Sequence, residues 1–158
     1  AYDSDIALVN GGGLRSGLEK GKISLRNLVT VLPYENDVVT LRITGREVVQ
    51  ALEHGFSALP EPSGAFPKVS GMLVRVDTAK PGGSRVVSGT LADGRPLETD
   101  KDYTLATVSY LALGGDAYSV LAGKRWIQSG LPFRDAAAKY FQKQDTVPVD
   151  LSERILFQ

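Results

Sequence analysis

The sequence contains no cysteine and a single histidine, His54, among its 158 residues. Without cysteine the chain has no disulfide framework, no iron–sulfur cluster held by thiolates and no thiol nucleophile, and its compartment stays undecided. Catalytic zinc sites usually take several histidine ligands, and one histidine beside Glu53 on an expected helix does not supply a converging set. We therefore expect His54 to be a partly exposed helix residue, and we expect no catalytic residue, metal ligand or cofactor site in this chain.

The sequence also lacks a long apolar run, a net charge and two common enzyme motifs. No run approaches the roughly 20 apolar residues that a membrane helix needs. Basic and acidic residues number 18 each, so no overall field draws in nucleic acid or an anionic membrane. The Gly-x-x-x-x-Gly-Lys-Ser/Thr phosphate loop and the Gly-x-Ser-x-Gly nucleophile elbow are both missing. Residues 1–5 are polar and acidic, so we expect no signal peptide within this sequence.

Hydrophobic residues make up 42% of the chain and charged residues 23%, which is typical of one globular domain with a single core. The first apolar run, residues 6–9, comes almost at once. It indicates a core strand close to the first residue, and we therefore expect a fragment of a longer protein.

Hydrophobic periodicity and turn residues predict both strands and helices. Strands are expected at 6–9, 38–44, 69–77, 85–91, 95–97, 103–108 and 154–157, with a hairpin turn at Asp93-Gly94. Helices are expected from Ser24 to Pro33 and at 47–56, 116–121 and 133–142. Because the two kinds of element are interspersed but not strictly alternating, the fold class is α+β, a single domain with a mixed sheet and flanking helices.

The first motif of interest is NGGGLR, residues 10–15, directly after the first expected strand. Three glycines let the backbone approach another group closely. Asn10 offers an amide that both donates and accepts hydrogen bonds, and Arg15 a planar guanidinium suited to oxyanions. The spacing alone fits a flexible turn with an unrelated arginine equally well.

Three further segments are weak signals when taken singly. Tyr34 and Asn36 follow a helix end at Pro33 and fit either one wall of a flat pocket or ordinary rim packing. Tyr110 closes a strand before Gly114-Gly115, and Asp116 then lies where an N-cap is favoured. The segment SGAF, residues 63–66, is typical of a loop. Together, two aromatic rings, two amides, a guanidinium and a carboxylate suit a purine nucleoside with its phosphate.

The strings NGGGLR, VLPYEN, TGRE, SGAF and YLALGGDAY, in this order and spacing, resemble the C-terminal domain of the 5'-nucleotidase family, and the resemblance runs from residue 6 to the final RILFQ. It implies that Tyr34 and Tyr110 sandwich the base. Asn10, Asn36 and Gly64 would then contact the edge or the neighbourhood of the base.

The resemblance further implies that Asp116 binds the ribose hydroxyls and that Arg15 contacts the nucleotide near its phosphates. In the family, a separate N-terminal domain holds two divalent metal ions and performs the hydrolysis. Residues 1–158 would thus be the substrate-binding domain, inactive alone, of a periplasmic or extracellular parent enzyme. The family often has phenylalanine at both stacking positions, and glycine where this chain has Ala117.

Two other functions fit the same residues. One is a stand-alone nucleotide-binding module without catalysis, against which the early core strand argues. The other is a family member adapted to another substrate, such as a cyclic nucleotide or a sulfur carrier. Tyrosines at both stacking positions favour retained base binding.

Overall fold

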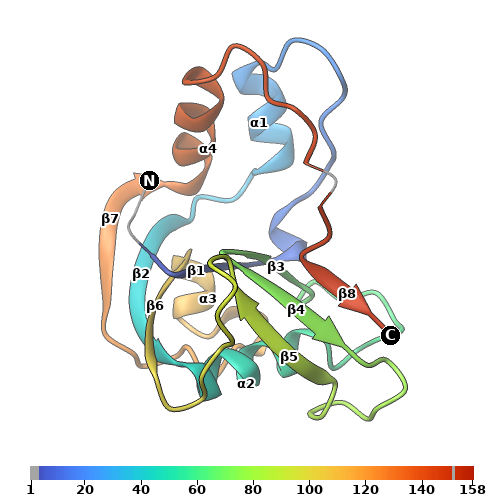
Figure 1. Ribbon diagram of the computed structural model, residues 1–158. Coiled ribbons are helices and arrows are strands. Elements are labelled where there is room, and N and C mark those ends of the chain that lie inside the picture. The colour runs from blue at the N-terminus through green and yellow to red at the C-terminus, as the bar shows by residue number, and fades with distance from the viewer. Residues whose placement is uncertain (1–3, 151) are drawn as a thin grey trace.

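Two mixed β-sheets and four α-helices make up the computed structural model, which describes residues 4–150 and 152–158 (Figure 1). The strands are β1 (Ile6–Asn10), β2 (Asp37–Thr44), β3 (Pro67–Ser70), β4 (Met72–Val76), β5 (Val86–Leu91), β6 (Asp102–Val108), β7 (Trp126–Pro132) and β8 (Ile155–Phe157). The helices are α1 (Leu25–Val31), α2 (Gly45–Gly55), α3 (Ser109–Ala112) and α4 (Phe133–Gln142). Short 3₁₀ turns, η1 (Gly11–Gly13) and η2 (Gly115–Ala117), follow β1 and α3.

The larger sheet has the strand order β3-β1-β6-β2-β7, and the smaller one the order β5-β4-β8. Each sheet contains one parallel pair, β1 with β6 and β4 with β8, while the other pairs are antiparallel. The α+β class with a mixed sheet and flanking helices is therefore confirmed, and a second small sheet is added to it.

Side-chain caps set the start of two helices. Ser24 accepts a hydrogen bond from the backbone N–H of Asn27, and the Asn27 side chain accepts one from the backbone N–H of Ser24, which closes a capping box at α1. Thr44 and Glu47 form the same arrangement at α2. Because α2 follows β2 without a loop, the cap at Thr44 fixes the direction of the helix relative to the larger sheet.

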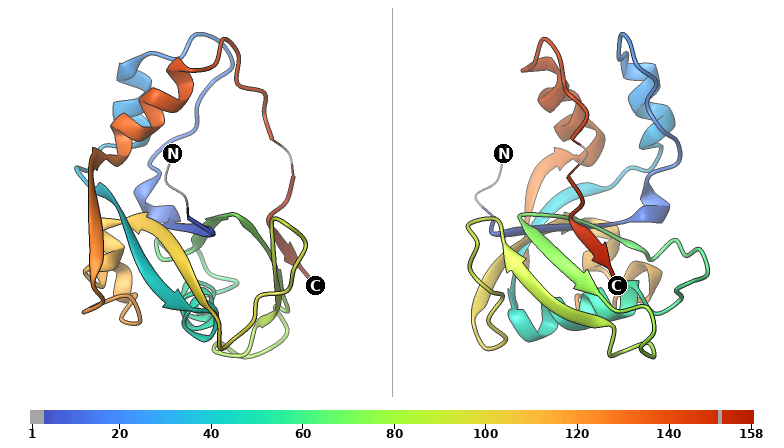
Figure 2. Two further views of the ribbon diagram at one scale, coloured as in Figure 1. Left: turned by 60° about the vertical axis from the view of Figure 1, so that its left-hand side comes forward. Right: turned by 45° about the vertical axis from the view of Figure 1, so that its right-hand side comes forward.

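The hydrophobic core draws on both sheets and on α2 and α3. Leu8, Ile43, Leu52, Val74 and Leu111 are among its fully or almost fully buried members. The paired helices α1 and α4 lie side by side beyond the end of the larger sheet (Figure 2), with Phe133 at the start of α4 packed against the core. Among the described residues, no helix is long and apolar enough to cross a membrane.

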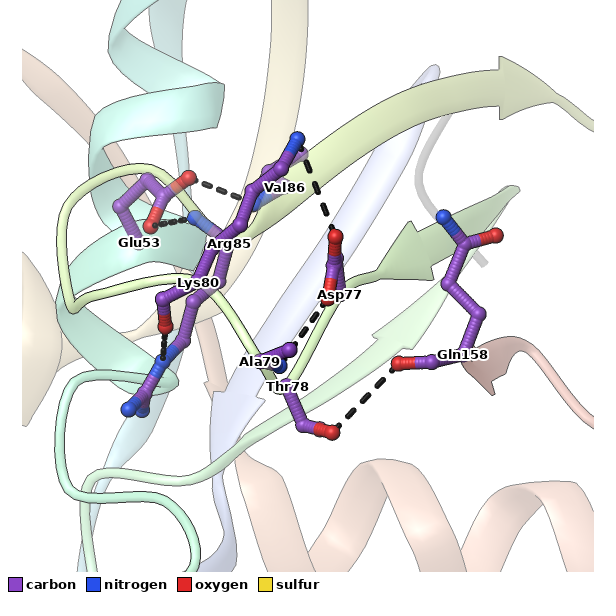
Figure 3. Close-up of polar contacts among 8 residues, drawn as sticks. All are labelled: Glu53, Asp77, Thr78, Ala79, Lys80, Arg85, Val86 and Gln158. Atoms are coloured by element: carbon purple, nitrogen blue, oxygen red, sulfur yellow. Dashed lines mark hydrogen bonds and ion pairs between the residues drawn. The ribbon is translucent and has the colours of Figure 1, made fainter.

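A buried polar network anchors the C-terminal turn of α2 to the loop before β5 (Figure 3). The Glu53 carboxylate is 9% exposed and accepts the backbone N–H groups of Arg85 (3.0 Å) and Val86 (2.6 Å). The Arg85 guanidinium in turn donates to the carbonyl oxygens of Lys80 and Ser57. Since each of these N–H groups receives an acceptor, the network stabilises this end of the helix.

Three expected elements differ from the structure, and one strand was missed. The strand expected at 95–97 is only an isolated bridge between Thr90 and Pro96. The single strand expected at 69–77 is two strands, because Gly71 adopts a left-handed φ of 78° and sends β3 and β4 into different sheets. No α-helix runs over 116–121, where η2 and turns follow the double glycine. Strand β7 was not predicted, since its exposed residues show no alternation.

Candidate functional site

The NGGG segment makes a close approach to the loop that contains Gly64. The N–H of Gly12 donates to the Gly64 carbonyl at 2.8 Å, and the N–H of Gly11 donates to the Phe66 carbonyl at 2.7 Å. A Cβ atom on Gly12 would lie 3.0 Å from the Gly64 Cα, so a side chain there forces the two backbones apart. The close approach expected of the glycines is therefore made to the chain itself. It places Asn10 beside residues 63–66.

Asp116 lies where β1, α3 and α2 meet. Its carboxylate accepts a hydrogen bond from Asn10 Nδ2 at 2.7 Å and another from the Tyr110 hydroxyl at 2.7 Å. The Asp116 N–H donates back to the Tyr110 oxygen at 3.1 Å. A side chain on Gly64 would approach the carboxylate, with its Cβ 3.6 Å from Oδ2. Four of the predicted residues, Asn10, Gly64, Tyr110 and Asp116, are thus brought together.

The backbone at Asp116 is left-handed, which corrects the expectation of a helix N-cap. Asp116 has φ 49° and ψ 31°, and Ala117 follows with φ 61°. Few residues other than glycine adopt positive φ, because the Cβ atom crowds the next carbonyl. A glycine at position 117 would take this conformation freely, whereas Ala117 takes it with strain.

The two predicted stacking rings are exposed. Tyr34 has 53% of its surface accessible and Tyr110 has 42%, so neither ring is buried in the core. The hydrogen bond to Asp116 raises the pKa of Tyr110, because losing the phenol proton would place two negative charges together. Tyr34 adds a smaller electrostatic effect of the same sign.

A small cavity connects Tyr34 to the end of β1. Asn10, Tyr34 and Asn36 line it together with the apolar side chains of Leu32 and Phe133. Asn10 therefore belongs both to this cavity and to the cluster around Asp116. Through Asn10, the cavity beside the exposed Tyr34 ring adjoins the carboxylate of Asp116, and aromatic faces with amide and carboxylate groups suit a nucleoside.

Arg15 lies at the outer edge of the site. Its backbone N–H donates to the Val31 carbonyl at 2.9 Å, and its guanidinium donates to the Gly12 carbonyl at 3.3 Å. The side chain is exposed and stays near the NGGG turn. A guanidinium carries five N–H groups, so this one contact leaves donors for an anion.

Two residues beside the site were not predicted as part of it. His54 is half-buried on α2, as expected for a helix residue, but its Nε2 lies 2.7 Å from the Asp116 carbonyl oxygen. Tyr118 is fully buried, and its hydroxyl donates to the Ala65 carbonyl at 2.6 Å. Burial raises the pKa of Tyr118. Neither contact leaves a local signal in the sequence, because each joins residues far apart in the chain.

No three His, Cys, Asp or Glu side chains converge at metal-binding distance within residues 4–150 and 152–158. The oxygen atoms of Asp116 instead accept hydrogen bonds from Asn10, Tyr110 and His54. Two of these donors, from Asn10 and Tyr110, reach the carboxylate, and the donor from His54 reaches the backbone carbonyl.

Comparison with known proteins adds independent information. The chain is 36% identical over 124 residues to the trifunctional nucleotide phosphoesterase protein YfkN of Bacillus subtilis (strain 168), covering 76% of this chain and 8% of that protein. It is 30% identical over 151 residues to the protein UshA of Escherichia coli (strain K12), covering 95% of this chain and 26% of that protein.

Among solved structures, the 5'-nucleotidase precursor from Thermus thermophilus is similar at a TM-score of 0.93 and 33% identity, covering 98% of this chain and 31% of that one. The chain thus spans less than a third of the length of each of these proteins. A family model described as 5'-nucleotidase, C-terminal domain, matches residues 1–123. With the fold and the motifs in agreement, the chain belongs to the 5'-nucleotidase family and corresponds to its C-terminal domain.

Proposed function

We propose that this chain binds the base and ribose of a nucleotide whose phosphate ester or pyrophosphate bond is hydrolysed by another domain of the parent protein. The observation that carries this proposal is the Asp116 carboxylate, held between Asn10 and Tyr110 beside an exposed aromatic ring. Tyr34 and Tyr110 would stack on the base, with Asn36 and Gly64 near its edge. Arg15, at the outer edge, would face the phosphates.

The catalytic part of the parent would supply the hydrolytic chemistry. We propose an upstream domain with two divalent metal ions, which activate water for attack on phosphorus. The parent would act as a nucleotide phosphohydrolase in nucleotide breakdown, in the periplasm or outside the cell. The name of the YfkN relative, a nucleotide phosphoesterase, supports a phosphate ester as the bond that is cleaved.

We expect this chain to bind adenosine and AMP with similar, weak affinity. Stacking contributes about 1–3 kcal/mol per base, from which the cost of association is subtracted, so the Kd should fall near the millimolar range. Titration followed by NMR measures it, with ribose 5-phosphate as the control that lacks a base. Unchanged resonances of Tyr34 and Tyr110 at saturating AMP would contradict the assignment of the pocket.

We also expect no release of phosphate from AMP by this chain alone, with Mn²⁺, Co²⁺ or Zn²⁺ added. The described residues hold no cluster of metal-binding side chains, and the chain has one histidine. A colorimetric phosphate assay checks this against a mock purification. Turnover that co-purifies with the chain through successive columns would show that hydrolysis is performed here.

A further inference from the structure

The turn that carries Asp116 needs support from the rest of the fold. Asp116 and Ala117 are consecutive residues with positive φ, and both carry a Cβ atom that disfavours this conformation. Such a conformation persists only when surrounding contacts hold it in place. The peptide group between the two residues is the critical part, because rotating it changes ψ of Asp116 and φ of Ala117 together and takes Ala117 out of the positive-φ region.

The His54 side chain holds this peptide group. Its Nε2 atom lies 2.7 Å from the Asp116 carbonyl oxygen. A carbonyl only accepts hydrogen bonds, so Nε2 carries the proton and donates it. Asn10 and Tyr110, by contrast, contact the carboxylate of Asp116. The backbone and the side chain of Asp116 are therefore fixed by different residues.

His54 is itself held firmly on two sides. The preceding residue, Glu53, is anchored by the buried network to the backbone of Arg85 and Val86, which fixes the end of α2 (Figure 3). The imidazole ring packs edge-on against the ring of Tyr118, with centroids 4.9 Å apart and planes at 81°. Tyr118 in turn is hydrogen-bonded to Ala65, in the loop that contains Gly64. The histidine thus joins the helix to both loops of the site.

We propose that His54 is a positioning residue for nucleotide recognition, which holds Asp116 in its left-handed conformation so that the carboxylate faces the ribose hydroxyls. The proposal rests on the proposed function. It assigns His54 no direct contact with the nucleotide. It makes His54 important for the preference for ribose and unimportant for stacking of the base.

Three variants distinguish the effect of the His54 N–H donor from the effect of the rest of the side chain. His54→Phe keeps a ring against Tyr118 and removes the N–H group. His54→Gln keeps an amide N–H at nearly the reach of Nε2, and His54→Asn is polar but too short. Affinity for adenosine and for 2',3'-dideoxyadenosine is measured for each by NMR titration, with amide exchange of residues 116–118 and melting temperature recorded alongside.

We expect His54→Phe and His54→Asn to lower the affinity for adenosine roughly five- to tenfold, as for one lost hydrogen bond, and to speed amide exchange in the turn. Affinity for dideoxyadenosine stays within about twofold of the unmodified chain, and His54→Gln restores both readouts. If His54→Phe fails to fold, the comparison of His54→Gln with His54→Asn still tests whether the N–H donor is needed.

Equal loss of both nucleosides in the Phe and Asn variants would reduce His54 to a structural residue and overturn the proposal. The proposal would also be overturned if the Phe and Asn variants showed faster amide exchange in residues 116–118 but kept the preference for adenosine over dideoxyadenosine. Failure of the proposed function is distinguishable, because the unmodified chain then shows no preference for adenosine over dideoxyadenosine. In that case the role of Asp116 is lost, and the positioning role of His54 is lost with it.

Discussion

Replacing Tyr34 and Tyr110 together by alanine is expected to remove measurable binding of adenosine to this chain. The two rings are 53% and 42% exposed, and they are the aromatic surfaces that the site offers to a base. Loss of each stacking face costs about 1–3 kcal/mol, which exceeds what a weak complex can lose and still be detected. Each single replacement should weaken adenosine and dideoxyadenosine alike, because stacking does not involve the ribose hydroxyls.

Tyr140 provides the matched control for this experiment. It is also 53% exposed, but it lies on α4 and does not line the cavity. Tyr140→Ala should therefore leave the titration unchanged. If the double variant binds adenosine as tightly as Tyr140→Ala does, the base is held elsewhere on the molecule.

The phenol groups of the two stacking residues should differ in importance. Tyr34→Phe keeps the ring and is expected to bind normally. Tyr110→Phe also keeps the ring, but it removes the donor that holds one oxygen of Asp116. Tyr110 would therefore both stack on the base and orient the carboxylate.

Replacing Asp116 by asparagine or alanine should abolish the preference for adenosine over 2',3'-dideoxyadenosine. A hydrogen bond to a charged acceptor contributes roughly 1.5–3 kcal/mol, and the diol offers two hydroxyls, so adenosine should weaken by at least about tenfold. Dideoxyadenosine has no such groups to lose and should bind almost as before. Titration of both nucleosides with both variants gives the difference directly.

Asp116→Asn is the sharper of the two variants, because it keeps the shape of the side chain. Asp116→Ala also leaves the amide of Asn10, which is 6% exposed, without its acceptor, and so carries a loss of stability. Asp145→Ala, at an exposed position outside the site, is a suitable control. Parallel losses for adenosine and dideoxyadenosine would remove the ribose from the role of Asp116.

Local signals in the sequence were sufficient for most of the fold. The Ser24 cap and the apolar spacing placed α1, and helix 133–142 was predicted with the bounds that the structure has. Strand β7 was missed because its exposed side chains carry no alternating pattern. The break at Gly71 was missed because a glycine inside an alternating run shows neither its φ angle nor a change of sheet.

The site was predictable only in part, because contacts between distant residues leave no local signal in the sequence. Resemblance to the family assembled Asn10, Gly64, Tyr110 and Asp116, which the structure brings into contact. The helix expected at Asp116 was wrong because tertiary hydrogen bonds, rather than local preference, determine that turn. Positive φ at an aspartate and an alanine follows from contacts across the fold, among them the bond from His54.

The parallel pairing of β4 with β8 also affects how the domain is made. Val74 pairs with Ile155 and Val76 with Phe157, whereas β5 follows β4 closely in sequence and forms the other side of the sheet. On the ribosome, the β4–β5 hairpin therefore emerges long before its third strand. Throughout that interval one edge of β4 is open, and an open strand edge pairs readily with other chains. The edge is closed only when residues 155–157 have emerged and paired with β4.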